Sequence, residues 1–183
     1  MKSGVYVIGA IVVVLLLWLV PAAWNFSSHA ANVKTTLEAT IAHYKMIGET
    51  DAAPLYAAAG GQEPDASSVQ KLIAAFSAVT RASSTPDQWK AVDALQKNLG
   101  DFFAPATQHA NSVSSNPHFV TLNQEITGHG GASTLVLEYN KAASVVQEDM
   151  KSFPGNMLGN MSFGGQPPFL YLDGKPRDIK VML

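Results

Sequence analysis

The stretch from Ser3 to Val33 contains no Lys, Arg, Asp or Glu, and this uncharged run constrains the fold more than any other feature. Its first part, Gly4 to Ala23, consists mainly of Val, Leu, Ile and Ala. About 20 such residues, rising 1.5 Å each in a helix, cover the roughly 30 Å hydrocarbon core of a bilayer. We therefore predict a single-pass transmembrane anchor over residues 1–25.

Aromatic residues border the predicted span. Tyr6 lies at one edge, and Trp18 and Trp24 lie at the other, where amphipathic rings prefer the headgroup level of the bilayer. These three residues are the expected membrane contacts. An alternative is a cleaved signal peptide, because Lys2 supplies a basic start and Val20-Pro21-Ala22 resembles a small-residue cleavage site.

The positions of the lysines around the span predict its orientation. The terminal amine and Lys2 precede the span, whereas the first cation after it is Lys34. Because basic residues favour the cytoplasmic side, we expect the N-terminus in the cytoplasm and the soluble domain in the periplasm or outside the cell. A cytoplasmic domain is the alternative.

Composition narrows the classes of partner. The net charge is -2 and charged residues make up 14% of the chain, so it carries no basic face of the kind that a nucleic-acid backbone requires. The chain has no cysteine, which excludes disulfides, thiolate metal ligands and cysteine nucleophiles. A surface of small uncharged polar residues packs against neighbours at low desolvation cost. We expect lipid and protein partners, and no nucleic acid or cofactor.

Beyond the anchor, apolar residues recur at steps of three and four, which predicts an all-α domain over residues 26–156. Helices are expected over about residues 27–47, 65–82, 85–106 and 117–153, and the Gly- and Pro-rich segment 48–64 is expected to be a loop or a short helix. Thr85-Pro86-Asp87 is a helix start with a hydroxyl cap, and Pro105 should end or kink the helix that follows. The predicted arrangement is a long antiparallel bundle with these core residues: Leu95, Leu99, Phe102, Phe119, Leu122, Ile126, Tyr139 and Val146.

The last predicted helix contains two apolar stripes that are out of phase. Leu135 lies nine residues after Ile126, which places it about 180° around an ideal helix. Either both faces are covered, or the glycines Gly128, Gly130 and Gly131 mark a kink that resets the phase.

The chain after this helix is expected to be an extended tail over residues 157–183. Phe153 should continue the buried stripe, Pro154 should stop the helix, and Gly155 or Asn156 should take a left-handed conformation that turns the chain. The tail is too apolar to lie free in water. We expect it to dock three aromatic residues into a groove on the bundle or on a neighbouring subunit: Phe163, Phe169 and Tyr171.

Three motifs in the second half occur together at a characteristic spacing. They are the segment Asn116 to Ile126, with a Phe followed by Leu-x-x-Glu-Ile, then Glu138-Tyr139-Asn140, then Ser152-Phe153-Pro154-Gly155-Asn156 ahead of a tail rich in Gly, Phe and Pro. The set resembles the bacterial LemA family. The first half departs from that pattern, because no Asp-Leu-Ile-Pro-Asn-Leu run follows Tyr44.

The resemblance implies an N-terminal transmembrane helix followed by a long antiparallel helical bundle. It implies no reaction, because the family has no established catalytic activity, and a branch of it is linked to membrane organisation. Members similar to this chain are commonly described with the short N-terminus outside, which is opposite to the orientation that Lys2 favours.

Few residues suggest chemistry. Gly128-His129-Gly130-Gly131 superficially resembles an esterase oxyanion loop, but the sequence has no Gly-x-Ser-x-Gly elbow, so a helix kink is the better interpretation. The histidines are dispersed without the spacing of a zinc site, and we interpret them as surface or capping residues. Glu148 and Asp149 are expected on a solvated helix face.

The sequence therefore predicts no catalytic, cofactor or metal site. The function that we expect is a non-enzymatic membrane-anchored scaffold that acts by self-association or as an accessory subunit of a larger membrane complex. One alternative is a membrane-tethered sensor with a ligand pocket between helices, and a less favoured one is a hydrolase.

Overall fold

A computed structural model describes the backbone of residues 2–60, 65–104, 107, 109–126 and 131–171, and the side chains of these residues from Val12 onward except that of Ile126. Most of the described residues are helical, and none of them forms a strand. The elements are α1 (Lys2–Ile47), the π-helix η1 (Gly48–Ala52), α2 (Ala53–Ala59), α3 (Asp65–Arg81), α4 (Thr85–Phe102), α5 (Asn111–Ser114), α6 (Pro117–Ile126), α7 (Gly131–Asp149) and α8 (Gly155–Phe163).

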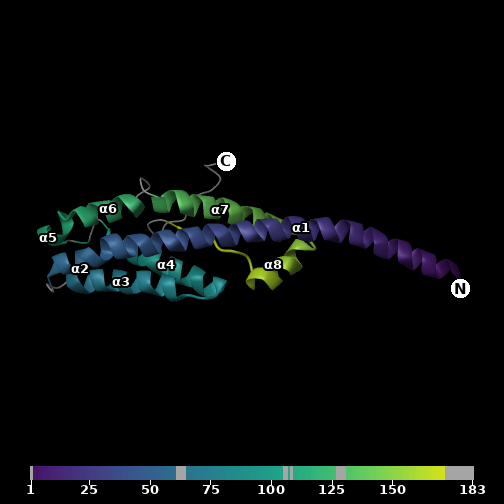
Figure 1. Ribbon diagram of the computed structural model, residues 1–183, viewed down its shortest axis with the longest axis horizontal. Coiled ribbons are helices and arrows are strands. Elements are labelled where there is room, and N and C mark those ends of the chain that lie inside the picture. Colours follow the sequence, from purple (N-terminus) through teal and green to yellow (C-terminus); the bar gives the residue numbers. More distant parts are fainter. Residues whose placement is uncertain (1, 61–64, 105–106, 108, 127–130, 172–183) are drawn as a thin grey trace.

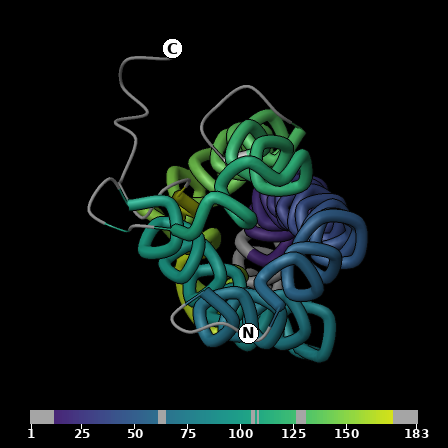
Figure 2. The backbone as a smooth tube through the Cα atoms, turned by 90° about the vertical axis from the view of Figure 1, so that its left-hand side faces the viewer, coloured from purple at the N-terminus to yellow at the C-terminus, as the bar shows by residue number. Residues whose placement is uncertain are grey.

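Helix α1 is the axis of the molecule. Its second half lies between two groups of helices, with α6 and α7 along one side and α2, α3 and α4 along the other, while its first half projects beyond the rest of the chain (Figure 1). Figure 2 looks along the bundle and shows the helices nearly end-on, grouped around the core. We call the end formed by η1, α2, α5 and α6 the distal end. The proximal end comprises residues 18–29 and 149–157, where α1 leaves the bundle.

The predicted anchor and the first predicted domain helix are one continuous helix of 46 residues. Pro21 lies inside it, and the domain boundary expected after residue 25 falls within it. The described part of this helix contains a stretch long and apolar enough to cross a membrane, and only 6% of that stretch is buried against the protein. A core helix would be mostly buried, so this half of α1 is not a core helix of the domain.

One apolar core connects α1, α3, α4, α7 and α8. Of the eight predicted core residues, six are buried: Leu95, Leu99, Phe102, Leu122, Tyr139 and Val146. Phe119 packs against the core but is only partly buried, and the side chain of Ile126 lies outside the described residues. Helical periodicity therefore predicted the phase of α4, α6 and α7 correctly.

The segment expected to be a loop or short helix is the π-helix η1 followed by α2. Gly48 allows η1 to approach α3, because a Cβ atom there would lie 2.8 Å from the Phe76 ring. Gly60, with φ of 59°, ends α2 in the left-handed conformation. Residues 61–64 lie outside the described residues.

The start of α4 differs by one residue from the expectation. Ser84, rather than Thr85, is the N-cap, and its hydroxyl accepts a hydrogen bond from the Asp87 backbone N–H. The helix ends at Phe102, ahead of Pro105, as the proline predicted.

The single long helix expected over residues 117–153 is two helices, α6 and α7. Gly128, His129 and Gly130 lie outside the described residues. Gly131 begins α7 beside α1, where an added Cβ would lie 2.8 Å from the His43 ring. The glycine at this position thus permits close packing of α7 against α1.

The fully extended tail expected from residue 157 is wrong for its first part, because α8 continues to Phe163. Pro154 and Gly155 separate α7 from α8, and the Phe153–Pro154 peptide is cis. Gly155 is not left-handed, since the described glycines with positive φ are Gly60, Gly164 and Gly165. Its role is steric: an added Cβ would lie 2.0 Å from the Asp149 carbonyl oxygen. The extended chain begins only after α8.

Candidate functional site

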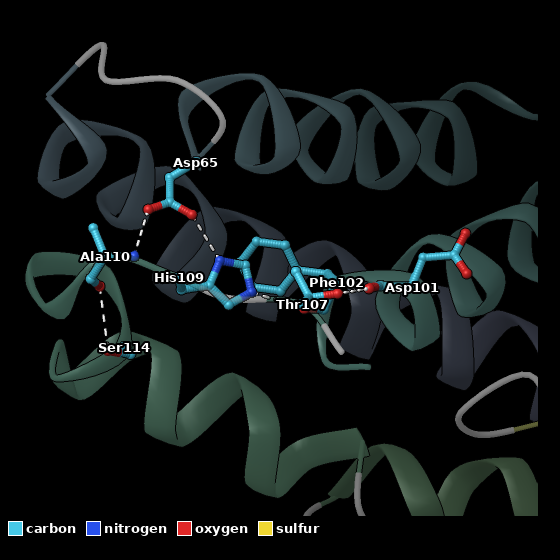
Figure 3. Close-up of polar contacts among 7 residues, drawn as sticks. All are labelled: Asp65, Asp101, Phe102, Thr107, His109, Ala110 and Ser114. Atoms are coloured by element: carbon cyan, nitrogen blue, oxygen red, sulfur yellow. Dashed lines mark hydrogen bonds and ion pairs between the residues drawn. The ribbon is translucent and has the colours of Figure 1, made fainter. Parts of the chain in front are cut away.

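The most buried polar cluster lies at the distal end and joins the start of α3 to the loop after α4. Asp65 contacts the His109 ring nitrogen Nδ1 at 2.8 Å and accepts a hydrogen bond from the Ala110 backbone N–H at 2.8 Å (Figure 3). The side chains of His109 and Asp65 are only 5% and 6% exposed. The Asp65 carboxylate thus contacts a residue 44 positions away in the sequence.

Both nitrogens of His109 have protein partners. The Nε2 atom lies 2.8 Å from the Phe102 carbonyl oxygen, which can only accept, so Nε2 carries a proton and donates it. The Nδ1 atom faces the Asp65 carboxylate, so this contact also needs a proton on one of the two groups. Neither nitrogen is available to a substrate. The pair has the composition of a catalytic Asp–His dyad but acts as a structural fastener.

Aromatic rings enclose this fastener. The rings of Phe102 and Phe119 lie 4.4 and 5.3 Å from the His109 ring, centroid to centroid. Figure 3 shows two further bonds that hold the loop: the Thr107 hydroxyl donates to the Asp101 carbonyl oxygen at 3.0 Å, and the Ser114 hydroxyl donates to the Ala110 carbonyl oxygen at 3.2 Å. The loop is therefore held at both ends.

Histidine–carboxylate pairing recurs through the described bundle. His43 on α1 contacts Glu125 on α6 at 2.8 Å, and Glu125 also accepts from the Ala132 backbone N–H at 3.0 Å. His118 on α6 contacts Asp51 in η1 at 3.0 Å. Each pair joins two elements that are far apart in sequence.

The fourth pair lies at the proximal end, where His29 on α1 contacts Asp149 at the end of α7 at 2.7 Å. The four described histidines pair with carboxylates across the bundle, which the sequence did not predict. His29 and His118 nevertheless lie near the surface, at 41% and 42% exposure, whereas His43 and His109 are largely buried. Glu148 is exposed as expected, and Asp149 is partly buried by its contact with His29. No spacing in the sequence reveals these pairs, because the partners are 44 to 120 residues apart. Among the described residues, no three His, Asp or Glu side chains form a group that could hold a metal ion.

The chain after α8 forms hydrogen bonds with both α4 and α7. We call residues 167–171 the tail segment. Asn140 donates to the Leu170 carbonyl oxygen and accepts from the Leu170 N–H, both at 2.8 Å. The Tyr139 hydroxyl donates to the Pro168 carbonyl oxygen at 2.9 Å, and Gln147 donates to that of Pro167 at 2.7 Å. Side chains thus supply the hydrogen bonds that an extended segment lacks.

A buried glutamine on α4 also holds the tail segment. Gln96 donates to the Tyr44 hydroxyl oxygen at 3.1 Å and accepts from the Tyr171 backbone N–H at 2.8 Å, so it joins α1, α4 and the tail segment. Burial raises the pKa of Tyr44 to about 12, against the opposing effect of the Gln96 hydrogen bond. Burial also raises the pKa of Tyr139, which keeps its hydroxyl a neutral donor.

The predicted tail anchors lie on this chain's own bundle. Phe163 is buried, its ring lies 5.8 Å from that of Trp89, and the Lys34 ammonium lies 5.6 Å from the Phe163 centroid. Phe169 and Tyr171 are half-buried, whereas Leu170, which was not among the predicted anchors, is buried. A role for these residues in binding a second protein stays a prediction.

The predicted membrane residues lie on the projecting half of α1. Trp18 and Trp24 are 53% and 78% exposed, and the side chain of Tyr6 lies outside the described residues. The Trp18 ring stacks on that of Phe153 at 6.1 Å with an interplanar angle of 30°. Phe153 is 59% exposed, so it does not continue the buried stripe as predicted. It joins the turn after α7 to the apolar half of α1.

Three clefts among the described residues bear on ligand binding. The widest, of about 600 Å³, is an open surface depression between the end of α3 and the start of α4, with Arg81, Asp87 and Lys90 in its lining. The other two are smaller. One, of about 160 Å³, lies beside η1 and is lined mainly by Lys45, Glu49, Ile73 and Phe76. It is smaller than the roughly 300 to 1,000 Å³ typical of small-molecule sites. The other, of about 250 Å³, lies at the proximal end between α1 and the turn after α7, and it combines Trp18 and Phe153 with Asn25, Asp149 and Ser152.

Comparison of the chain with known protein families, with curated proteins and with solved structures found no match to any of them.

Proposed function

We propose that this protein is a membrane-anchored helical scaffold that acts by association, with itself or as an accessory subunit of a larger membrane complex, rather than by catalysing a reaction. The observation that carries the proposal is the continuity of α1. The same helix provides the exposed apolar stretch and a central element of the bundle core.

A continuous helix couples the anchor to the domain more tightly than a linker does. Val33, Leu37 and Tyr44 of α1 are fully buried in the bundle, so the domain cannot turn freely relative to the apolar half of the helix. A flexible linker would let an enzyme or a sensor search for its ligand near the membrane. A continuous helix instead holds the surface of the domain at a constant distance from the membrane and in a constant orientation, as expected of a scaffold.

We also propose the long antiparallel arrangement that the LemA-like motifs imply. It is supported by the contacts of α1 with α7, because His29 early in the domain part of α1 meets Asp149 at the end of α7, while His43 meets the start of α7 beside Gly131. Two motif residues, Tyr139 and Asn140, have a clear role in holding the tail segment. The domain is proposed to lie in the periplasm or outside the cell, as the position of Lys2 favours.

The decisive experiment is purification of the tagged full-length chain from its native membranes in mild detergent, followed by measurement of its native mass and identification of co-eluting chains. The scaffold proposal expects a protein mass of at least twice 19.4 kDa, or a partner at constant stoichiometry. A monomer without partners would contradict it.

The tail provides a matched variant for the same measurement. Truncation after Gly165 keeps α8 and removes the tail segment. If the tail serves association, the truncated chain should stay folded by circular dichroism but lose its higher mass or its partner. An unchanged assembly would assign the tail segment to its own bundle alone.

A further inference from the structure

The turn between α7 and α8 presents an aromatic side chain to the surroundings beside the apolar half of α1. We call residues 150–155 the α7–α8 corner. In this corner Phe153 is 59% exposed and stacks on Trp18, which is itself 53% exposed. An exposed pair of stacked rings is unfavourable in water and favourable at a lipid headgroup boundary.

The corner holds Phe153 in a defined position. The turn is tight, because Gly155 approaches the Asp149 carbonyl so closely that a side chain at 155 would collide with it. Pro154 and Gly155 are buried, and the His29–Asp149 contact fastens the end of α7 to α1 just beside the corner. Phe153 is therefore a rigid projection and not the end of a free loop.

The contact with Trp18 sets the depth of Phe153. Trp18 lies within the apolar run, near its domain-side end. If α1 crosses a bilayer, Trp18 must lie near the level where the acyl chains meet the headgroups. A ring whose centroid is 6.1 Å away then lies at a similar depth. The cleft behind it, with Asn25, Asp149 and Ser152 on one side and rings on the other, has the mixed polarity of the same zone.

Helix α8 leads away from this level. Its last residue, Phe163, lies beside Lys34, which is roughly 24 Å farther along α1 than Trp18 at 1.5 Å per residue. Met161, near this end, is also apolar and is 77% exposed. It lies far from the level of Trp18, on the water side of the proposed bilayer. Exposure alone would therefore make both Phe153 and Met161 candidates for lipid contact. Of the two, only Phe153 lies at the depth of Trp18.

We infer that the α7–α8 corner is a second membrane contact, in which Phe153 inserts beside Trp18 into the headgroup and upper acyl region of the leaflet facing the domain. This inference rests on the proposed anchoring of α1. One helix through a bilayer leaves its tilt free, whereas a second contact on one side of that helix restricts the tilt and the rotation of the whole domain. The partner is the lipid bilayer itself.

The absence of cysteine makes the test direct, because single cysteines can be introduced into the full-length chain without background labelling. Three variants carry an environment-sensitive fluorophore: Ser152→Cys next to Phe153, Met161→Cys near the end of α8, and Leu15→Cys within the apolar run of α1. Each purified protein is reconstituted into phosphatidylcholine vesicles. Quenching by a lipid-borne nitroxide and by aqueous iodide reports the surroundings of each label.

We expect strong lipid quenching at positions 15 and 152 and strong iodide quenching at 161. Adding Phe153→Asp to Ser152→Cys should raise iodide quenching at 152 several-fold, whereas Met161→Asp in the same background should leave it unchanged. Circular dichroism of both variants checks that the bundle is intact.

The contrary outcomes separate two failures. A lipid-embedded label at 15 with a water-exposed label at 152 would overturn the second contact and leave the anchoring in place. A water-exposed label at 15 would overturn the anchoring and the inference together. A label at 152 that neither quencher reaches would show that protein covers the corner. Lipid quenching at 161 would show that the domain lies flat on the membrane. Either result overturns the inference.

Discussion

A histidine–aspartate pair joins helices at each end of the bundle, and the two pairs differ in how deeply they are buried. At the distal end, Asp65 and His109 form a pair that is almost fully buried, with aromatic rings around it. At the proximal end, the corresponding pair of His29 and Asp149 is 41% and 33% exposed, and Asp149 shares a cleft with the exposed stack of Trp18 and Phe153. The Asp65–His109 pair is therefore shielded from solvent, whereas the His29–Asp149 pair is partly open to it.

The difference has an energetic meaning. Burying ionisable groups costs desolvation free energy, so a buried pair stabilises a fold only when both partners are present and hydrogen-bonded. Asp65 and His109 meet this condition with three further contacts to backbone groups and rings. An exposed pair costs little to form and little to lose. Single substitutions at the distal pair should therefore reduce stability strongly. At the proximal end the aromatic rings remain exposed and can contact a membrane.

The largest effect is expected from breaking the distal pair. His109→Ala removes one partner and leaves the Asp65 carboxylate buried, so the free energy of unfolding should fall by about 3 to 5 kcal/mol. Denaturant unfolding in detergent, followed by circular dichroism, measures the loss. His29→Ala at the proximal end is the matched control and should cost less than about 1 kcal/mol. Equal losses in the two variants would remove the proposed distinction between the ends.

The tail segment, between the two ends, is held by neutral hydrogen bonds. Asn140→Ala leaves the N–H and the carbonyl of Leu170 without their partner. Because a buried unsatisfied group costs about 1 to 3 kcal/mol, we expect a loss of roughly 2 to 4 kcal/mol and faster proteolysis of the tail. Asn98→Ala removes an exposed bond within α4 and serves as the control. A tail that stays protected in the Asn140 variant would contradict this account of the tail segment.

The buried Tyr44 hydroxyl predicts a dependence of stability on alkaline pH. Its pKa is raised to about 12 in the folded protein, compared with 10.0 for an ordinary tyrosine. The folded state therefore holds the proton more tightly. The resulting stability, about 2 to 3 kcal/mol, is fully present below pH 10 and is lost as the pH rises toward about 12.

Unfolding measured across this pH range should thus show a falling midpoint. Tyr44→Phe should make the fall shallower, and Tyr56→Phe, at an exposed position on α2, should not. Identical pH profiles for all three proteins would show that Tyr44 is not responsible. Burial of Tyr139 acts in the same direction and should account for part of the remaining slope.

The smallest effect is expected for a charged pair on the solvent-exposed surface near the proximal end. Lys151 and Glu148 contact each other one helical turn apart, and both side chains are largely exposed. Lys151→Ala should change the free energy of unfolding by less than about 0.5 kcal/mol, because exposed pairs gain little and are screened by salt. A loss comparable to that of His109→Ala would show that the proximal end also depends on charge.

Sequence patterns predicted well those features that depend on neighbouring residues. The helical stripe of Leu95, Leu99 and Phe102 identified core residues of α4, and Pro105 correctly predicted that the helix ends before it. The uncharged run identified the apolar half of α1. In each case the information lies within a few residues, because helical periodicity, prolines and charge-free runs act locally.

Contacts between distant residues could not be predicted in this way. The pairing of His109 with Asp65, the docking of Leu170 on Asn140 and the stacking of Phe153 on Trp18 join residues that the sequence leaves unrelated. Gly155 is a further example. A side chain is excluded at this position by the nearby carbonyl of α7, a distant-contact effect, and not by the backbone angles of Gly155 itself. The sequence by itself determined that this chain is helical and carries one exposed apolar stretch. Only the tertiary structure decided which polar groups are buried together and which aromatic side chain stays outside, because those outcomes depend on how whole helices pack.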